Sequence, residues 1–478
     1  MSEKAEIAMT EDVTDLNQDA TYKSLNRKWD FRILPVLFLI FFSSFLDRAS
    51  IGNASIAGLG KDLSLKGQSY NIALALFFVV YLLVDVPAVW LFKIVGRGRF
   101  LSASVVCWGC TTLGIGFVTN EAQLYALRCM LGFFEGGLTP CLFLYLGLFY
   151  SRYELQSRIA WFYISAPLSN AVGGLLASGL GQIHVGRYRT WRWIFIVEGA
   201  ATILLGFFCW FVLPNKPSDA GYLTAEEKVV AEARLAENTN SFGNEAEQRE
   251  KFNIKKAGRG IFDQNTILIA VASLGIYCNV YAYSLFSPTI IRQFGYSVVD
   301  SQLLSAPPYV LAAIWVLVSC YLSDRLRLRG PFMLFGSVLL IIGWTIQLAC
   351  HGTGVRYFGL FVVAVGAFGS IPPSLTWLIN NVQPEISRNT ATGLVVAFGN
   401  VGGIITTFTY MGSGGPKTGN ALQIGMSCLT LVCTGSLMMI NSWENKKRAR
   451  GERDYRLTNG KTPAEQLGSR HPEFRLCL

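Results

Sequence analysis

The chain contains little charge and little histidine. Of its 478 residues only 15% are charged, whereas a soluble globular protein carries about a quarter. The three histidines, His184, His351 and His471, fall in predicted loops or in the tail. Cys107 and Cys110 have the spacing of a redox motif, but they lie inside an apolar run with no second pair or histidine nearby. Since nucleophile motifs and cofactor signatures are also missing, we expect no metal site, no cofactor and no enzyme activity.

Long apolar runs occupy most of the chain instead. Hydrophobic residues make up 51% of it, and the mean hydropathy is +0.38. The N-terminus "MSEKAEIAMTEDVTDLNQDA" is polar and acidic, which predicts that no cleavable signal peptide is present. The formal net charge of +10 comes from basic residues in loops and tails, which favours anchoring at the cytoplasmic side over binding of nucleic acid. These features predict an all-α integral membrane protein in a lipid bilayer.

Windows of about twenty apolar residues predict roughly twelve spanning helices. They cover residues 31–53, 70–92, 99–119, 122–149, 158–182, 193–213, 265–287, 303–323, 331–350, 356–380, 389–411 and 421–442. The largest gap follows the sixth span, so we expect two pseudo-symmetric halves of six helices each. The predicted parts are an N-terminal tail at 1–30, bundles at 31–213 and 265–442, a central loop at 214–264 and a C-terminal tail at 443–478.

Charges outside the spans predict the topology. In the central loop, Thr224 and Glu227 form a capping box that opens an amphipathic surface helix. Basic residues flank the first and last spans: Lys28, Arg32, Lys446, Lys447, Arg448 and Arg450. Together with the basic central loop, they favour both termini in the cytoplasm.

A weak internal repeat relates the two halves. The stretch "LFKIVGRGRFL" follows the second span and "YLSDRLRLRGP" follows the eighth, so both occupy the same place in their group of six. Such symmetry is typical of transporter folds, whose binding site lies near the midplane between the repeats. In the second stretch, Asp324, Arg325 and Arg329 are candidate gating or structural charges.

Few charges lie inside the predicted spans. They are Asp47, Arg48, Asp85, Arg128, Glu135 and Glu198. Each costs about 2.5 kcal/mol or more if it faces lipid, so each should meet a partner or a water-filled cavity. Neighbours on a helix point in different directions, so Asp47 and Arg48 do not simply neutralise each other. Arg128 and Glu135 are seven residues apart and share one helix face, about 10 Å apart along the axis.

Four of these charges form a candidate site. Arg48 and Arg128 are predicted to converge on an anionic group, because guanidinium matches carboxylate geometry. Asp47 and Glu135 are the predicted protonatable partners, which take up a proton when desolvated and release it when hydrated or paired with arginine. The alternative is a purely structural network between the first and fourth helices.

The remaining polar candidates carry weaker signals. Asp85 and Glu198 favour pairing between helices or with a helix terminus. Polar side chains that can reach a cavity are Tyr81, Asn170, Trp377, Asn380 and Asn400. Each is individually more typical of an interhelical contact, and glycine-rich stretches such as "GGLLASG" favour close helix packing.

Several motifs together resemble one family. "FLDRASIGNASIAGLGKDL", "LRCMLGFFEGGLTP", "WRWIFIVEG", "TWLINN", "GNVGGI" and the tail "NKKRARGERDYRL" with "HPEFRL" are similar to the anion:cation symporter family of the major facilitator superfamily. The similarity is strongest to its fungal branch, which includes allantoate, nicotinate, pantothenate and biotin permeases. It covers nearly the whole chain from about Lys28.

The resemblance implies proton-coupled uptake of a small organic anion by alternating access, in the plasma membrane. By motif it places substrate and proton on Asp47, Arg48, Arg128 and Glu135, and a substrate contact on Asn400. The chain departs from the family at "DVPAVW" in the second helix, at the loop after that helix and at "GSGGPKTG" after the eleventh. A nutrient sensor of the same fold that does not transport, and a uniporter or exchanger, are the alternatives.

Overall fold

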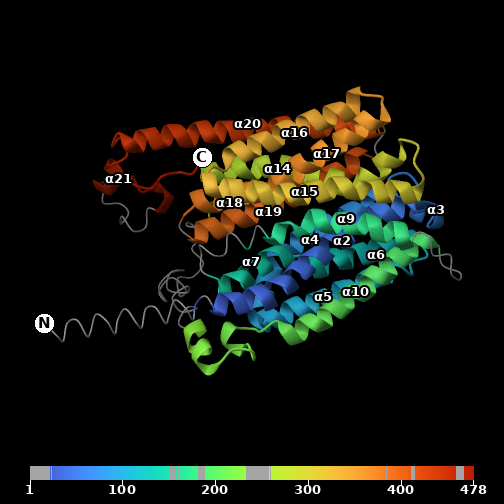
Figure 1. Ribbon diagram of the computed structural model, residues 1–478, viewed down its shortest axis with the longest axis horizontal. Helices are drawn as coiled ribbons and strands as arrows, with labels where there is room; N and C mark the ends of the chain where they lie inside the picture. Colours follow the sequence, from blue (N-terminus) through green and yellow to red (C-terminus); the bar gives the residue numbers. More distant parts are fainter. Residues whose placement is uncertain are drawn as a thin grey trace.

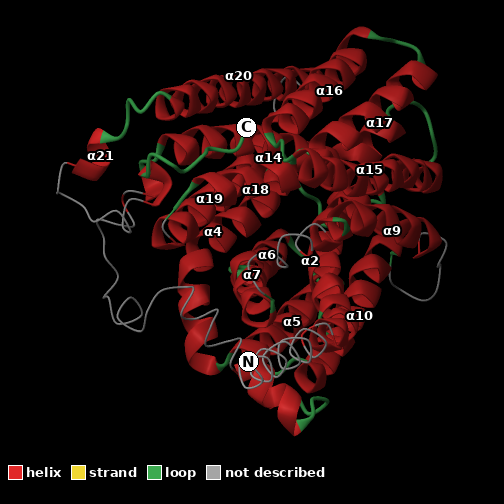
Figure 2. Cartoon of the chain, turned by 60° about the vertical axis from the view of Figure 1, so that its left-hand side comes forward, coloured by secondary structure: helices red, strands yellow, loops and turns green. Residues whose placement is uncertain are grey.

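The computed structural model describes residues 22, 24–150, 158, 161–180, 189–232, 258, 260–383, 385–410, 415–458 and 468–478. Within these ranges the chain forms helices and no strand (Figure 2). The helices of the first half of the chain lie in one group and those of the second half in another (Figure 1). The predicted all-α fold is confirmed.

The helices follow the predicted spans closely. The first group consists of α2 (Leu34–Ile56), α3 (Leu59–Asp62), α4 (Ser69–Val95), α5 (Arg97–Ile115), α6 (Glu121–Glu135), α7 (Leu138–Phe149), α9 (Ser165–Leu180) and α10 (Thr190–Val212). The second group consists of α14 (Gln264–Arg292), α15 (Val298–Leu326), α16 (Gly330–Ala349), α17 (Thr353–Gly369), α18 (Ile371–Asn381), α19 (Glu385–Tyr410) and α20 (Gly415–Ala449). Short helices η1 (Pro217–Asp219), α21 (Tyr455–Thr458) and η3 (Gly468–Arg470) lie outside both groups.

Length and apolar composition suit these helices to a bilayer. In the described ranges, nine helices are long and apolar enough to cross a membrane, or ten when the bent pair Ser69–Asp85 and Pro87–Val95 counts as one. Large apolar side chains such as Trp90, Leu204 and Phe211 are exposed on the outside of the bundle. A bilayer accepts such a surface, because its hydrocarbon is as apolar as these side chains.

The fourth span of the first group is broken beside one of the predicted charges. α6 ends at Glu135, and Gly137 before α7 has a φ of 76°, a conformation that glycine adopts without strain. A Cβ atom at Gly137 would lie 2.3 Å from the Cβ of Ala88. The sequence analysis predicted one continuous helix over 122–149. The glycine pair after Glu135 explains the break.

The fourth span of the second group is broken at the equivalent place. Ser370 separates α17 from α18, and Pro372 and Pro373 follow at once. Proline lacks the amide hydrogen that continues the helical ladder, so it favours a new helix start here. Interrupted helices at corresponding positions of two repeats are typical of binding sites in membrane transport folds.

The two groups touch at one end of the bundle, which we call the α3 end. A Cβ atom on Gly174 of α9 would lie 2.6 Å from Oγ of Ser305 in α15. A Cβ atom on Gly52 of α2 would lie 2.5 Å from the carbonyl oxygen of Leu285 in α14. Both figures show α9 next to α15 (Figures 1 and 2). Glycine therefore allows backbones of the two groups to approach at the α3 end.

The predicted capping box of the central loop is present. The amide of Thr224 donates to Oε2 of Glu227 at 2.9 Å, and the amide of Glu227 donates to Oγ1 of Thr224 at 3.3 Å. Burial alone favours the neutral acid, but the bonds from Lys28 and Thr224 outweigh it and hold the pKa of Glu227 below its usual value. The Lys28 ammonium lies 2.6 Å from that carboxylate, which ties the loop to the start of the first span. The predicted surface helix is present over residues 225–232, and its predicted continuation lies outside the described residues.

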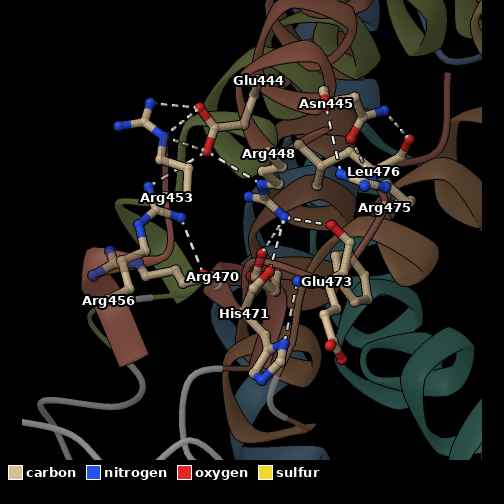
Figure 3. A network of polar contacts seen from close by, with 12 residues as sticks. Glu444, Asn445, Arg448, Arg453, Arg456, Arg470, His471, Glu473, Arg475 and Leu476 are labelled. Carbon is tan, nitrogen blue, oxygen red and sulfur yellow. Dashed lines mark hydrogen bonds and ion pairs between the residues drawn. The ribbon is translucent and has the colours of Figure 1, made fainter. Parts of the chain in front are cut away.

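The C-terminal segment 468–478 docks on the second group at the opposite end, which we call the α21 end (Figures 1 and 3). Nη1 of Arg448 donates to the carbonyl oxygens of Ser469 at 3.0 Å and Phe474 at 2.7 Å. Glu444, one turn earlier in α20, accepts from Arg448 at 3.2 Å and from Arg453 at 2.6 Å. α20 therefore holds the segment mainly through hydrogen bonds from Arg448 to the backbone carbonyl groups of the segment.

The same segment contacts α18. The carbonyl oxygen of Cys477 accepts from Nε1 of Trp377 at 2.9 Å and from Nδ2 of Asn381 at 3.1 Å. The amide of Cys477 donates back to Oδ1 of Asn381 at 2.7 Å. The segment thus joins α18 to α20 across the α21 end.

We expect Arg448→Ala to destabilise this end of the protein. Arg448 is 7% exposed, and its loss leaves the segment's carbonyl groups without a donor, at a cost of roughly 1–3 kcal/mol. Thermal unfolding of the detergent-solubilised protein checks this as a lower apparent melting temperature. Arg450→Ala is the matched control, because the Arg450 side chain is 73% exposed. An equal effect of both substitutions would contradict the docking.

Candidate functional site

The centre of the first group contains a buried ion pair. Arg48 of α2 contacts Glu135 at the end of α6 through Nε at 2.7 Å and Nη2 at 2.6 Å, both to Oε1. Ser44, one turn before Arg48, donates its hydroxyl hydrogen to the same oxygen. Arg48 is 6% exposed and Glu135 is 0% exposed. Glu135 thus neutralises Arg48 at the break in the fourth span.

Aromatic rings surround the Arg48 guanidinium. Its Cζ lies 5.1 Å from the ring centroid of Phe45, 5.5 Å from that of Phe77 and 4.9 Å from that of Tyr81. Phe77 also lies 5.1 Å from Cζ of Arg128, so one ring contacts both arginines. These contacts exclude water while the ring faces still attract the cations. The predicted convergence of the two arginines is thus reflected in their shared contact with Phe77.

Arg128 is a buried cation without an ion pair among the described residues. Its Nε donates to the carbonyl oxygen of Ala73 in α4 at 3.2 Å, and its Nη1 has no hydrogen-bond partner in the part of the chain that the structure describes. Arg128 is only 1% exposed. A buried, unpaired guanidinium is costly, and a carboxylate ligand with two oxygens would satisfy it.

Asp47 points away from the Arg48–Glu135 pair, as its adjacent position on α2 predicts. It is 1% exposed, and it lies next to Trp108 and Thr112 of α5. Neither of its carboxylate oxygens has a hydrogen bond of normal geometry within the described ranges. It still interacts electrostatically with Glu135 and Arg128. Asp47 and Arg48, although adjacent in the sequence, therefore lie in two different surroundings.

The second group reaches the ion pair through Tyr281 of α14. The Tyr281 hydroxyl donates to Oδ1 of Asn400 in α19 at 2.9 Å, and Tyr281 also interacts with Arg48. The Tyr281 ring packs against Phe78 of α4 at 4.8 Å between centroids. Tyr281 therefore links Asn400, in the second group of helices, to Arg48 in the first group. Tyr81, a predicted candidate, contacts Arg48 directly through its ring.

Three further predicted cavity residues lie elsewhere. Trp377 donates its indole N–H to the carbonyl oxygen of Cys477 in the docked C-terminal segment. Asn380 neighbours the side chain of Cys477 in the same segment. Asn170 of α9 donates to the carbonyl oxygen of Ala166 at 2.8 Å, and its Oδ1 is buried without a partner among the described residues.

The predicted gating charges form a local pair at the α21 end. Nη2 of Arg329 lies 2.5 Å from Oδ1 of Asp324, and Nη1 of Arg329 donates to Oγ of Ser323 at 2.7 Å. Arg325 is exposed. Asp324 and Arg329 thus join the end of α15 to the start of α16.

Sequence reasoning missed three contributors: Ser44, Phe77 and Tyr281. Ser44 and Phe77 lie one turn before Arg48 and Tyr81 respectively, so helical spacing from known candidates was an available signal. Tyr281 carried no such signal, because its contact with Arg48 joins two helices far apart in the chain.

Comparison with known proteins decides the family. Residues 37–407 match the Major Facilitator Superfamily. The chain belongs to this superfamily. Membership establishes the twelve-helix fold of two six-helix halves, a multi-pass membrane protein and a transporter family rather than an enzyme family.

Curated relatives agree with this superfamily assignment. The chain is 33% identical to a high-affinity nicotinic acid transporter of Saccharomyces cerevisiae, over 95% of this chain and 84% of that protein. It is also 33% identical to the major facilitator-type transporter hxnP of Emericella nidulans, over 95% and 93% respectively. The predicted resemblance to fungal permeases is confirmed by these relatives.

Solved structures show the same fold. A proton:xylose symporter bound to 6-bromo-6-deoxy-D-glucose aligns with a TM-score of 0.69 at 13% identity, covering 85% of this chain and 95% of that one. A bacterial homologue of the lysosomal transporter Spinster, in an inward-facing and unoccupied conformation, aligns with a TM-score of 0.59 at 16% identity, covering 85% and 94%.

Proposed function

We propose that this superfamily member is a secondary active transporter that carries a small carboxylate together with a proton by alternating access. One observation carries the proposal: the buried Arg48–Glu135 ion pair lies beside the unpaired Arg128, and Phe77 contacts both cations. An anion and Glu135 compete for Arg48. Protonation of Glu135 frees Arg48 for the anion, which links the two ligands thermodynamically.

Each site residue has one role in this cycle. A carboxylate enters and binds Arg128, whose free nitrogen offers a hydrogen bond. Glu135 then takes a proton, releases Arg48 to the substrate and removes a buried negative charge. Asn400 and Tyr281 contact the substrate from the second group, so its binding promotes closure of the two halves. Tyr81 and Asn170 are further contacts, Asp47 is the second proton site, and the Asp324–Arg329 pair acts in gating.

The relatives favour a nutrient as cargo. A high-affinity nicotinic acid transporter is among them, so nicotinate is the first candidate, followed by pantothenate and allantoate. We place the protein in the plasma membrane with both termini, the central loop and the α21 end in the cytoplasm. We propose the domain division predicted from the sequence, with tails at 1–30 and 443–478, helix bundles at 31–213 and 265–442, and a central loop at 214–264.

We expect Arg128→Ala to abolish uptake. Truncating a buried charge that contacts a charged ligand costs about 2 kcal/mol or more, which is roughly a thirtyfold loss of affinity. Labelled nicotinate, pantothenate, allantoate and biotin are supplied at about pH 5 and about pH 7.5 to cells that lack their own uptake systems. Arg325→Ala is the control, because Arg325 is exposed.

The alternatives predict different results in the same assay. Uptake of one carboxylate that rises at acid pH and disappears only in Arg128→Ala supports proton symport. Uptake that is independent of pH supports a uniporter or exchanger. Binding without uptake, in protein that reaches the cell surface, supports a nutrient sensor and overturns the proposal.

A further inference from the structure

A second acid is buried next to Asp47. Glu198 of α10 is 2% exposed, interacts electrostatically with Asp47 and lies beside Ser50 of α2. All four oxygens of the two carboxyl groups lack a hydrogen bond of normal geometry within the described ranges. Glu198 has no role in the transport cycle proposed above.

The packing of α2 on α10 fixes the relative position of the two acids. The hydroxyls of Ser43 and Thr202 lie 2.7 Å apart. The helices are antiparallel, because Trp191 at the start of α10 donates to Asp62, just beyond the end of α2, at 3.1 Å. Asp47 follows Ser43 by four residues, and Glu198 precedes Thr202 by four. Each acid therefore lies about one turn, or about 5–6 Å, from the hydroxyl contact, on the same side and towards the α3 end.

Two further polar groups face this pair from α5. Nε1 of Trp108 and Oγ1 of Thr112 are buried and face the Asp47 carboxylate, but they make no hydrogen bond of normal geometry within the described ranges. Gly199 brings α5 close, since a Cβ atom there would lie 2.3 Å from the amide nitrogen of Leu113. The junction of α2, α5 and α10 is thus a buried polar site rather than an isolated acid.

Among the described residues, no cation forms an ion pair with either acid of this junction. Arg192 of α10 lies 3.1 Å from Asp62, and Arg48 is held by Glu135 on another face of α2. Arg128 reaches Asp47 only electrostatically, from α6. Glu135 of α6 also acts electrostatically on Asp47. The sequences of α5 and α9 supply no charged residue at this level, and Tyr281 of α14 lies beside Arg48. Two neighbouring acids without a cation in contact do not both ionise in an apolar interior.

We propose that Asp47 and Glu198 form a carboxyl pair that holds one proton across the α2–α10 contact, and that Glu198 is thereby a positioning residue for the coupled proton. The role in coupling rests on the proposed symport; the shared proton does not. When an anion neutralises Arg128, Asp47 loses the nearest free cation, takes up a proton and shares it with Glu198. Departure of the anion reverses the transfer, and the proton leaves.

Infrared spectroscopy of the purified protein tests the shared proton without any substrate. Wild type should show the C=O stretching band of a buried protonated carboxyl group that disappears as the pH is raised. Glu198→Gln should shift this titration by about one pH unit or more towards acid, because the neighbouring negative charge is gone. Asp47→Asn should change the same band. A titrating band that is unchanged in Glu198→Gln would overturn the pair, as would the absence of any such band.

Uptake measurements test the role in coupling. We expect Glu198→Gln to shift the pH of half-maximal uptake towards acid. The double variant with Asp47→Asn and Glu198→Gln should take up substrate no more slowly than Asp47→Asn alone. Thr202→Val is the control, because it removes the hydroxyl contact and keeps both acids. If Glu198 had only a structural role, Glu198→Gln would behave like Thr202→Val and leave the pH profile of uptake unchanged. If wild type transports no carboxylate but the band behaves as expected, the symport proposal fails and the pair stands. If wild type shows acid-stimulated uptake and Glu198→Gln changes neither band nor profile, the pair fails and symport stands.

Discussion

Glu135→Gln should take up its carboxylate but concentrate it less than wild type does. Glutamine is neutral at every pH and still accepts a hydrogen bond from Arg48, so the site remains permanently in its protonated form. A gradient of one pH unit is worth about 1.4 kcal/mol per proton, or about tenfold accumulation. We expect the variant to lose this factor for each unit of the gradient, and to retain exchange of labelled for unlabelled substrate.

Accumulation in cells or proteoliposomes with an imposed pH gradient measures this effect. Glu227→Gln is the control, because Glu227 is a carboxylate paired with Lys28 outside the spans. It should accumulate substrate like wild type. Accumulation by Glu135→Gln that follows the gradient as wild type does would exclude Glu135 as the coupling residue and would leave Asp47 in that role.

Gly174→Val should block transport by keeping the two groups of helices apart at the α3 end. The added side chain would overlap Oγ of Ser305 at 2.6 Å and the carbonyl oxygen of Gln302 at 2.7 Å, both in α15. Overpacking of this kind costs roughly 1–3 kcal/mol, enough to change the population of the closed arrangement about 5- to 150-fold. We expect uptake to fall by a similar factor while carboxylate binding persists.

Gly179→Val provides a matched control in the same helix. Among the described residues, no heavy atom lies within 4 Å of a Cβ atom at Gly179, so this substitution adds the same side chain without a described contact across the groups. Initial uptake rates and equilibrium binding are measured for both variants. Equal uptake by the two variants would show that closure at the α3 end is not needed for transport.

The sequence predicted the number and order of the spans because lipid demands long apolar helices, a local property that hydropathy reports directly. It also selected Asp47, Arg48, Arg128 and Glu135, because charge is rare and costly in such helices. The sequence did not predict which arginine binds Glu135. Arg128 shares a helix with Glu135, but Arg48 of another helix makes the contact, and such pairing depends on how helices pack.

Other features also lay beyond local pattern. The break after Glu135 depends on Gly137, and its glycine pair resembled an ordinary packing motif. Trp377 and Asn380 had the polarity of cavity residues, but they meet a segment about a hundred residues further along the chain. Glu198 had an arginine, Arg192, six residues before it, yet Arg192 binds Asp62 and Glu198 faces Asp47.

Carboxylate affinity as a function of pH tests the central claim most directly, which is that a proton on Glu135 releases Arg48 and thereby strengthens binding of the anion. Calorimetric titration of purified wild type with the transported carboxylate should show tighter binding as the pH falls, approaching about tenfold per pH unit when one proton is taken up. Glu135→Gln should bind with a weaker dependence on pH than wild type, because only the Asp47–Glu198 pair is then left to take up a proton. An affinity in wild type that does not change with pH, or an unchanged dependence in Glu135→Gln, would contradict it.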